Sequence, residues 1–167
     1  APVQDFLLAP LADAGPTLLL LTHEDRPVDR SAPFVAGMDS VVLALPARTA
    51  ADASLPFEDA GPGQRTTVNL SDGPKPVVKL DGLAFDARSR RLAIVGAATD
   101  NLLLSTTLGG LRDATAPRLR TGNNPVAVAF LPDGRVATAD RLGDTVSLLG
   151  EGGRSEQVVV GTPSRST

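Results

Sequence analysis

Few side chains in this sequence have an obvious capacity for chemistry. His23 is the only histidine, the residue type most often used as a general base near neutral pH. Its segment, His-Glu-Asp-Arg-Pro-Val-Asp, matches no known metal-binding spacing. Two roles for His23 remain open: a general base or metal ligand on a loop, or an ordinary solvated histidine. Asn123 and Asn124 offer carbonyl oxygens to a hard cation, with Asp72 and Asp140 as further ligands. The alternative is turn chemistry, because asparagine tolerates positive φ.

Composition excludes several other chemistries. The chain has no cysteine, which excludes disulfides, thiolate zinc sites, thiol catalysis and covalent c-type haem attachment within it. Ser105, Ser147 and Ser166 lack the Gly-x-Ser-x-Gly context of a nucleophilic serine. A net charge of −3 gives no basic footprint for nucleic acid. No apolar run approaches the roughly 20 residues that span a membrane.

The elements that must position these side chains are short strands. Thr121–Gly150 contains three apolar runs, Val126–Phe130, Arg135–Ala139 and Thr145–Leu149, each bounded by turn residues. Pro132-Asp133-Gly134 predicts a tight turn, because proline presets φ and glycine accepts positive φ. Gln157–Val160 supplies a fourth strand.

This unit occurs more than once. Phe130 aligns with Phe85, Val136 with Leu92, and Asp144 with Asp100, which gives a period of about 40–45 residues, that of four-stranded propeller blades. The recurrence of Asp100 and Asp144 predicts a structural turn or cap role. The N-terminal part fits the same plan with two insertions, His23–Ala36 and Pro46–Arg65. The sequence thus predicts an all-β chain of about three blades of four antiparallel strands, at residues 5–70, 80–121 and 125–160. The partial propeller spans 1–163, and 164–167 form a linker or tail.

A Gly-x-x-Pro turn, the PVAVAFLPDGRVATAD strand pair and Asp-Thr-Val-Ser at 144–147 resemble the YVTN/NHL-type β-propeller repeat. The Tyr-Val-Thr-Asn core is replaced by Val136-Ala137-Thr138-Ala139, and such repeats occur in functionally unrelated proteins. The resemblance permits calcium, as in propeller lactonases. It also permits haem on a partner domain or chain, as in di-haem peroxidases of the MauG type.

Alternating strand direction predicts which loops share a face of the propeller. The connections between blades and those between the second and third strands of a blade emerge on the same face. Binding sites are usually formed by loops on a rigid scaffold. We expect ligand or partner binding there, with no metal ligand assigned, by His23, Asp25, Asp72, Lys75, Asn123, Asn124 and Asp140.

Three blades fall short of the about four to eight that close known propellers, and blades bury their faces only against neighbours. We therefore expect another polypeptide or a second copy to complete the propeller. The predicted function is a non-catalytic scaffold or interaction module without a cofactor of its own. The alternatives are the propeller portion of a redox enzyme and a divalent-cation-dependent lactonase. The first residues, Ala-Pro-Val-Gln, are those of a processed mature N-terminus or of an excised piece. The former suggests a periplasmic or secreted protein.

Overall fold

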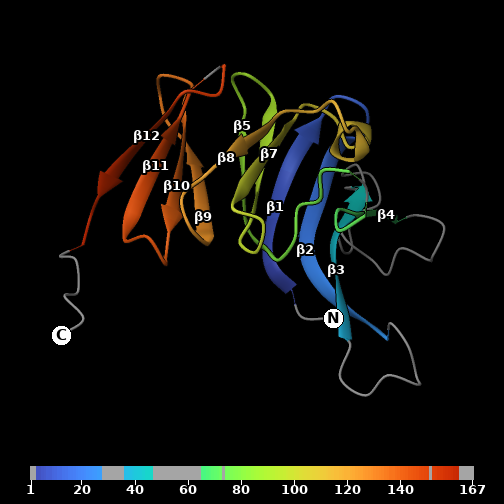
Figure 1. The fold of residues 1–167 in the computed structure, drawn as a ribbon. Helices are drawn as coiled ribbons and strands as arrows, with labels where there is room; N and C mark the ends of the chain where they lie inside the picture. The colour runs from blue at the N-terminus through green and yellow to red at the C-terminus, as the bar shows by residue number, and fades with distance from the viewer. Residues whose placement is uncertain (1–2, 28–35, 47–64, 73, 151, 162–167) are drawn as a thin grey trace.

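The computed structural model describes residues 3–27, 36–46, 65–72, 74–150 and 152–161, and these fold into three four-stranded antiparallel sheets (Figure 1). Blade 1 consists of β1 (Val3–Leu11), β2 (Gly15–Pro27), β3 (Ala36–Pro46) and β4 (Thr66–Asn69). Blade 2 consists of β5 (Leu80–Asp86), β6 (Arg91–Gly96), β7 (Asn101–Ser105) and β8 (Arg118–Arg120). Blade 3 consists of β9 (Pro125–Phe130), β10 (Val136–Asp140), β11 (Thr145–Leu149) and β12 (Ser155–Val159). The fold is an incomplete propeller, and η2 (Gly109–Arg112) is a short 3₁₀ helix between β7 and β8.

The turns have the residue chemistry that their geometry requires. At Pro132-Asp133-Gly134, the Gly134 amide donates to the Leu131 carbonyl at 2.9 Å and Gly134 has φ of 86°. The Asp133 carboxylate accepts from the Arg135 amide at 3.0 Å. The predicted tight turn is therefore confirmed. Asp100 and Asp144, with φ of 48° and 49°, stand immediately before the third strand of their blades. Their recurrence has a backbone cause, because aspartate enters the left-handed region more readily than most residues.

Blade 1 differs in detail from the expected strands. The sequence places the start of an insertion at His23, whereas β2 continues to Pro27 and pairs with β3 from Thr17↔Pro46 to Pro27↔Ala36. His23 is thus a strand residue, opposite Ser40. Pairing of the two backbones overrides the local preference of a charged, proline-containing segment for a loop. Residues 28–35 and 47–64, the remainder of both predicted insertions, lie outside the described residues.

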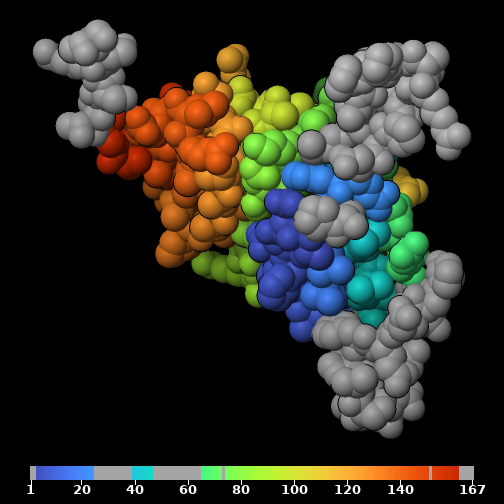
Figure 2. Space-filling view, turned by 90° about the horizontal axis from the view of Figure 1, so that it is seen from below, coloured from blue at the N-terminus to red at the C-terminus, as the bar shows by residue number. Residues whose placement is uncertain are grey.

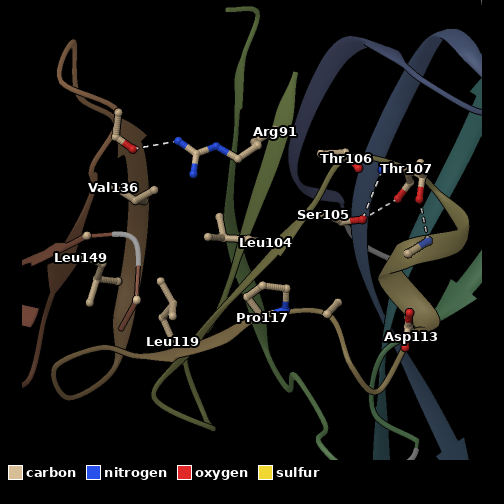
Figure 3. Close-up of a pocket in the computed structure, with 15 residues that line it drawn as sticks. Arg91, Leu104, Ser105, Thr106, Thr107, Asp113, Pro117, Leu119, Val136 and Leu149 are labelled. Carbon is tan, nitrogen blue, oxygen red and sulfur yellow. Dashed lines mark hydrogen bonds between the residues drawn. The ribbon is translucent and has the colours of Figure 1, made fainter. Parts of the chain in front are cut away.

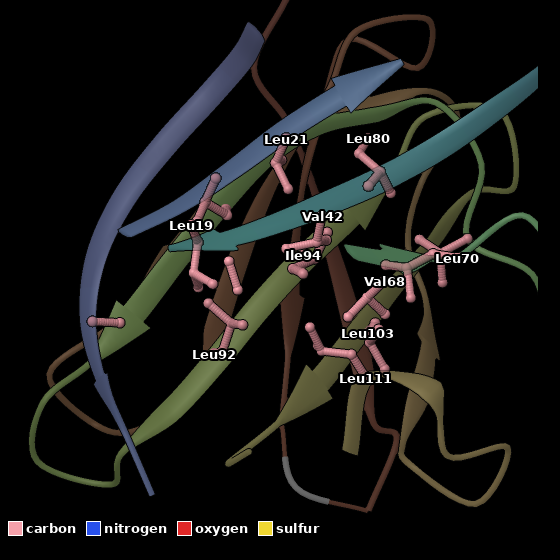
Figure 4. Packing of buried hydrophobic residues seen from close by; sticks show 14 of the residues in the cluster. Leu19, Leu21, Val42, Val68, Leu70, Leu80, Leu92, Ile94, Leu103 and Leu111 are labelled. Carbon is pink, nitrogen blue, oxygen red and sulfur yellow. The ribbon is translucent and has the colours of Figure 1, made fainter. Parts of the chain in front are cut away.

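Two aliphatic cores hold the blades together. The first lies between blades 1 and 2, where Leu19, Leu21 and Val42 of blade 1 pack with Leu92 and Ile94 of blade 2 (Figure 4). The second lies between blades 2 and 3 and is formed by fully or almost fully buried aliphatic side chains: Ala93, Val95, Leu102, Val136 and Leu149. The first strands of the three blades lie side by side, because β1 contacts β5 and β5 contacts β9. Blade 2 therefore packs against blade 1 with one sheet face and against blade 3 with the other.

Gly96, at the end of β6, has no room for a side chain. A Cβ there would lie 2.6 Å from Thr99 Oγ1 and 2.7 Å from Val77 Cγ1. Thr99 Oγ1 is itself hydrogen-bonded to Asn101 Oδ1 at 2.8 Å, so it is not free to move away. We expect Gly96→Ala to lower the free energy of unfolding by about 1–3 kcal/mol through overpacking, measured by urea denaturation followed by circular dichroism.

The matched control for this substitution is Gly150→Ala. The nearest atom to a Cβ at Gly150 is the Arg154 carbonyl oxygen at 3.8 Å, an ordinary contact distance. Equal losses of stability in the two variants would show that crowding at Gly96 is not the cause.

Candidate functional site

The predicted site residues fall into two groups, one at each blade junction. His23 belongs to the junction of blades 1 and 2, through its register partner Ser40. The Ser40 amide donates to Ser71 Oγ at 2.7 Å, and Ser40 Oγ accepts from the Lys79 amide at 2.8 Å. His23 Nε2 is buried and has no hydrogen-bond partner among the described residues. Asp72 follows Ser71 and accepts from Asn69 Nδ2 at 3.2 Å.

Two members of the predicted set contribute less to this first group. Lys75 is exposed on the connection between blades 1 and 2. The side chain of Asp25 lies outside the described part of the chain, although its backbone pairs with Met38.

Asn123, Asn124 and Asp140 gather at the junction of blades 2 and 3. Asn124 has φ of 58°, and its amide donates to Asp100 Oδ1 at 2.7 Å. Asn124 Nδ2 donates to the Ala97 carbonyl at 3.1 Å, while the buried Asn124 Oδ1 has no partner in the described structure. The Asn123 carbonyl accepts from the Leu142 amide at 3.2 Å. These contacts give both asparagines a part in the geometry of the turns.

Asp140 is the centre of a buried polar network. Only 2% of the residue is exposed. Its Oδ1 accepts from Thr138 Oγ1 at 2.9 Å, and its Oδ2 accepts from Thr145 Oγ1 at 3.1 Å and Ser147 Oγ at 2.6 Å. Ser147 Oγ in turn accepts from the Gly122 amide at 2.9 Å. Three hydroxyl donors thus engage this carboxylate. Among the described residues, no group of three histidine or acidic side chains lies close enough together to hold a metal ion.

A polar cleft of about 700 Å³ opens beside this network between blades 2 and 3. It is lined by polar or small residues from both blades: Asp100, Arg120, Thr121, Gly122, Asn123, Gly143, Thr145, Ser155 and Gln157. Asn123 is the only member of the predicted set in this lining.

A second cleft of about 490 Å³, also between blades 2 and 3, is mainly apolar (Figure 3). Leu104 and Leu119 of blade 2 face Val136 and Leu149 of blade 3 across it. Arg91 bridges the blades, because its guanidinium donates to the Gly134 carbonyl at 2.8 Å. The size is within the range of about 300–1,000 Å³ of small-molecule pockets. Sequence reasoning missed this cleft, because apolar alternation identifies the lining residues but not the separation of the two sheets.

One aspartate ties blade 1 to the edge of this apolar cleft. Asp13, in the turn between β1 and β2, accepts from the amides of Leu108 and Gly109 at 2.8 and 2.9 Å. Partial burial acts to raise the pKa of Asp13, but the hydrogen bonds from the Gly109 and Leu108 amides outweigh it and hold the pKa below its usual value. The contact therefore stabilises the fold when Asp13 is ionised.

We expect the contribution of Asp13 to depend on pH. Because its folded-state pKa is depressed, the stabilisation is present above the unfolded value of about 3.9 and is lost as pH falls through the folded pKa. Asp13→Asn should therefore be less stable than the natural protein at pH 6, and the gap should shrink below about pH 4. Urea denaturation at a series of pH values measures it. A gap that stays constant down to pH 2.5 would contradict the assignment.

The two outermost sheet faces have no other described sheet stacked on them. We call the side of blade 1 away from blade 2 the blade-1 face, formed by Phe6, Leu8, Leu18, Leu20, Leu43 and Leu45. The side of blade 3 away from blade 2 is the blade-3 face, formed by Ala127, Ala129, Ala137, Ala139, Val146, Leu148 and Val158. Phe6 is 69% exposed and Leu8 55%. The space-filling view shows blades 1 and 3 at opposite ends of the row of sheets, with blade 2 between them (Figure 2).

Comparison with known proteins bears on the fold. No family model and no curated protein sequence matches the chain. The structure is similar to that of Kuenenia stuttgartiensis hydrazine synthase, with TM-score 0.62 and 15% identity over 92% of this chain and 46% of that one. It is less similar to a putative 6-phosphogluconolactonase from Bacteroides uniformis, with TM-score 0.44 and 10% identity over 92% of this chain and 52% of that one. The chain thus spans about half the length of both structures. Within the described residues, no helix has the length and hydropathy needed to cross a membrane.

Proposed function

We propose that this chain is a non-catalytic β-propeller module, built of YVTN/NHL-type repeats, that forms part of a larger propeller or complex. The observation that carries the proposal is the pair of apolar sheet faces at the two ends of the three-bladed unit. Isolated apolar residues are common on protein surfaces, whereas a contiguous apolar patch marks an interaction site.

The blade-1 face has the composition of a buried surface. In register, Phe6 stands beside Leu20 and Leu43, and Leu8 stands beside Leu18 and Leu45. The opposite face of the same strands carries Leu19 and Leu21, both 0% exposed against blade 2. Strands that are apolar on both faces are typical of sheets covered on both sides. Blade 1 is covered on one side by blade 2, and its other side is suited to a further blade.

The repeat itself supports the same function. Phe85 and Phe130 occupy equivalent positions at the ends of β5 and β9, and each packs toward the preceding blade. A repeat unit of this kind gains stability from its neighbours. The function proposed here is therefore to present two blade-sized surfaces and the loops between them to other polypeptide.

Native mass spectrometry of the protein purified from its natural cells, with a visible absorption spectrum on the same sample, tests this function. We expect a native mass above that of the same polypeptide measured under denaturing conditions. A stable monomer that binds no hydrophobic dye would contradict the proposal. A visible chromophore in the complex would favour the redox-enzyme alternative. Hydrolytic activity lost with a chelator would favour the lactonase alternative.

A further inference from the structure

The junction between blades 2 and 3 shows how successive blades of this protein pack. On the side of blade 2 that faces blade 3, three of the four residues on the first two strands are glycine or alanine, with Gly82 opposite Val95 and Ala84 opposite Ala93. A Cβ on Gly82 would lie only 3.2 Å from Ala127 Cα, so the backbones of β5 and β9 approach closely. Blade 3 places larger side chains, Val128, Phe130 and Val136, against this surface.

The blade-3 face repeats the small-residue pattern of blade 2. Ala127 stands opposite Ala139, and Ala129 stands opposite Ala137. In the sequence repeat, these residues occupy the positions of Gly82, Val95, Ala84 and Ala93. Blade 3 thus has a face like the one with which blade 2 contacts blade 3. No described sheet covers this face of blade 3.

The blade-1 face has the complementary large residues. Phe6 and Leu20 are paired in register, as are Leu8 and Leu18, on the two strands that correspond to β9 and β10. These residues lie on the side of blade 1 that faces away from blade 2, which is where a preceding blade would pack. Phe130 lies on the equivalent side of blade 3, the side that packs on the preceding blade, blade 2. The described three-bladed unit therefore has, at its two ends, a large-residue face and a small-residue face of the kinds that pack together between blades 2 and 3.

We propose that two copies of this chain assemble head to tail, so that the blade-1 face of each packs on the blade-3 face of the other. Two of the described three-bladed units would close one ring of six, within the range of about four to eight blades of known propellers. This inference rests on the proposed function, since it names the partner that covers the two faces. Large side chains against small ones fill a core at normal density.

Like faces would not pack in this way. Two blade-3 faces would bring alanine against alanine and leave voids, whereas two blade-1 faces would bring Phe6, Leu8 and Leu20 against their own copies and overpack. A head-to-tail contact between two copies closes on itself when the rotation fits, and it then contains two identical interfaces. The structure therefore favours unlike faces in contact.

The test uses two charge substitutions at exposed positions of β1 and β9, Leu8→Lys on the blade-1 face and Ala129→Glu on the blade-3 face. We expect light scattering after size-exclusion chromatography to give twice the chain mass for the natural protein, and loss of the dimer for each variant alone. An equimolar mixture of the variants should recover a dimer. That heterodimer has one unaltered interface and one in which the new lysine faces the new glutamate.

Each other result would overturn the inference. These are a monomeric natural protein, open higher oligomers, a dimer that survives either single substitution, and a mixture that remains monomeric. The control Leu142→Lys changes a leucine that is 66% exposed outside both faces and should leave the dimer intact. Circular dichroism verifies that each variant is folded. Phe6→Lys with Ala127→Glu is a second pair for the same mixing experiment if either first variant fails to fold.

The result also separates this inference from the proposed function. A complex of the natural protein with a different polypeptide, found by native mass spectrometry, would overturn the second copy as partner and leave the module function supported. A chain that associates with nothing would contradict both.

Discussion

Replacing Asp140 by alanine is expected to lower the free energy of unfolding by about 2–4 kcal/mol, because two buried hydroxyl groups and one partly buried hydroxyl group would lose their acceptor. The donors come from β10 and β11: Thr138 and Ser147 are 1% and 0% exposed, and Thr145 is partly buried. Through Ser147, the network also holds the amide of Gly122 in the connection from blade 2. Gly122 is packed so closely on the Asp140 carboxylate that a Cβ there would collide with it. The loss is therefore expected at the blade junction as well as within the sheet.

Circular dichroism during urea denaturation is the suitable measurement, since the chain has no tryptophan or tyrosine for fluorescence. Asp133→Ala is the matched control, because the Asp133 side chain is half exposed and bonds only with Arg135 in its own turn. We expect its cost to stay within about 1 kcal/mol, the usual upper value for an exposed ion pair. Similar losses in the two variants would show that the Asp140 network contributes little.

Replacing Ile94 by alanine is expected to cost about 2–5 kcal/mol, through lost burial and the cavity left behind. Ile94 is fully buried in the core between blades 1 and 2, on the face of β6 that also carries Leu92 (Figure 4). The aliphatic side chains around it come from several strands, so the site has little freedom to collapse. Leu142→Ala, at a leucine that is 66% exposed, should change stability by no more than about 0.5 kcal/mol.

All variants should be compared at one protein concentration, because stability depends on concentration when unfolding is coupled to dissociation. A loss for Ile94→Ala no larger than that for Leu142→Ala would indicate that blades 1 and 2 do not form one cooperative core. A second transition confined to one variant would indicate that the blades unfold separately.

Local features of the sequence were sufficient to predict the blades. Pro132-Asp133-Gly134 specifies its turn through fixed φ, a side-chain acceptor and tolerance of positive φ, all of which act within four residues. The alignment of Phe130 with Phe85 predicted that β5 and β9 are equivalent, and both are the first strands of their sheets. The same approach placed His23 in a loop, because the segment after it is charged and contains proline. It could not anticipate that β3 would pair with that segment as far as Pro27.

The candidate sites depend on contacts that no local pattern contains. The apolar cleft is formed where Leu104 and Leu119 of one sheet meet Val136 and Leu149 of the next, residues that are distant in sequence. Asp13 appears as an ordinary turn residue, and its role depends on amides more than 90 residues away. Asn124 was singled out for its carbonyl oxygen, but its amides contact Asp100 and Ala97 of the preceding blade.

The sequence by itself determined that this protein is an all-β chain of repeated four-stranded blades, because turns and the alternation of side chains act over a few residues. Residues 18–21 are four consecutive leucines, so their strand is apolar on both sides. The tertiary structure decided which side is used. Leu19 and Leu21 are buried against blade 2, whereas Leu18 and Leu20 remain on the blade-1 face. That choice depends on which sheet stacks on which, and the packing energy that sets it comes from side chains distant in sequence.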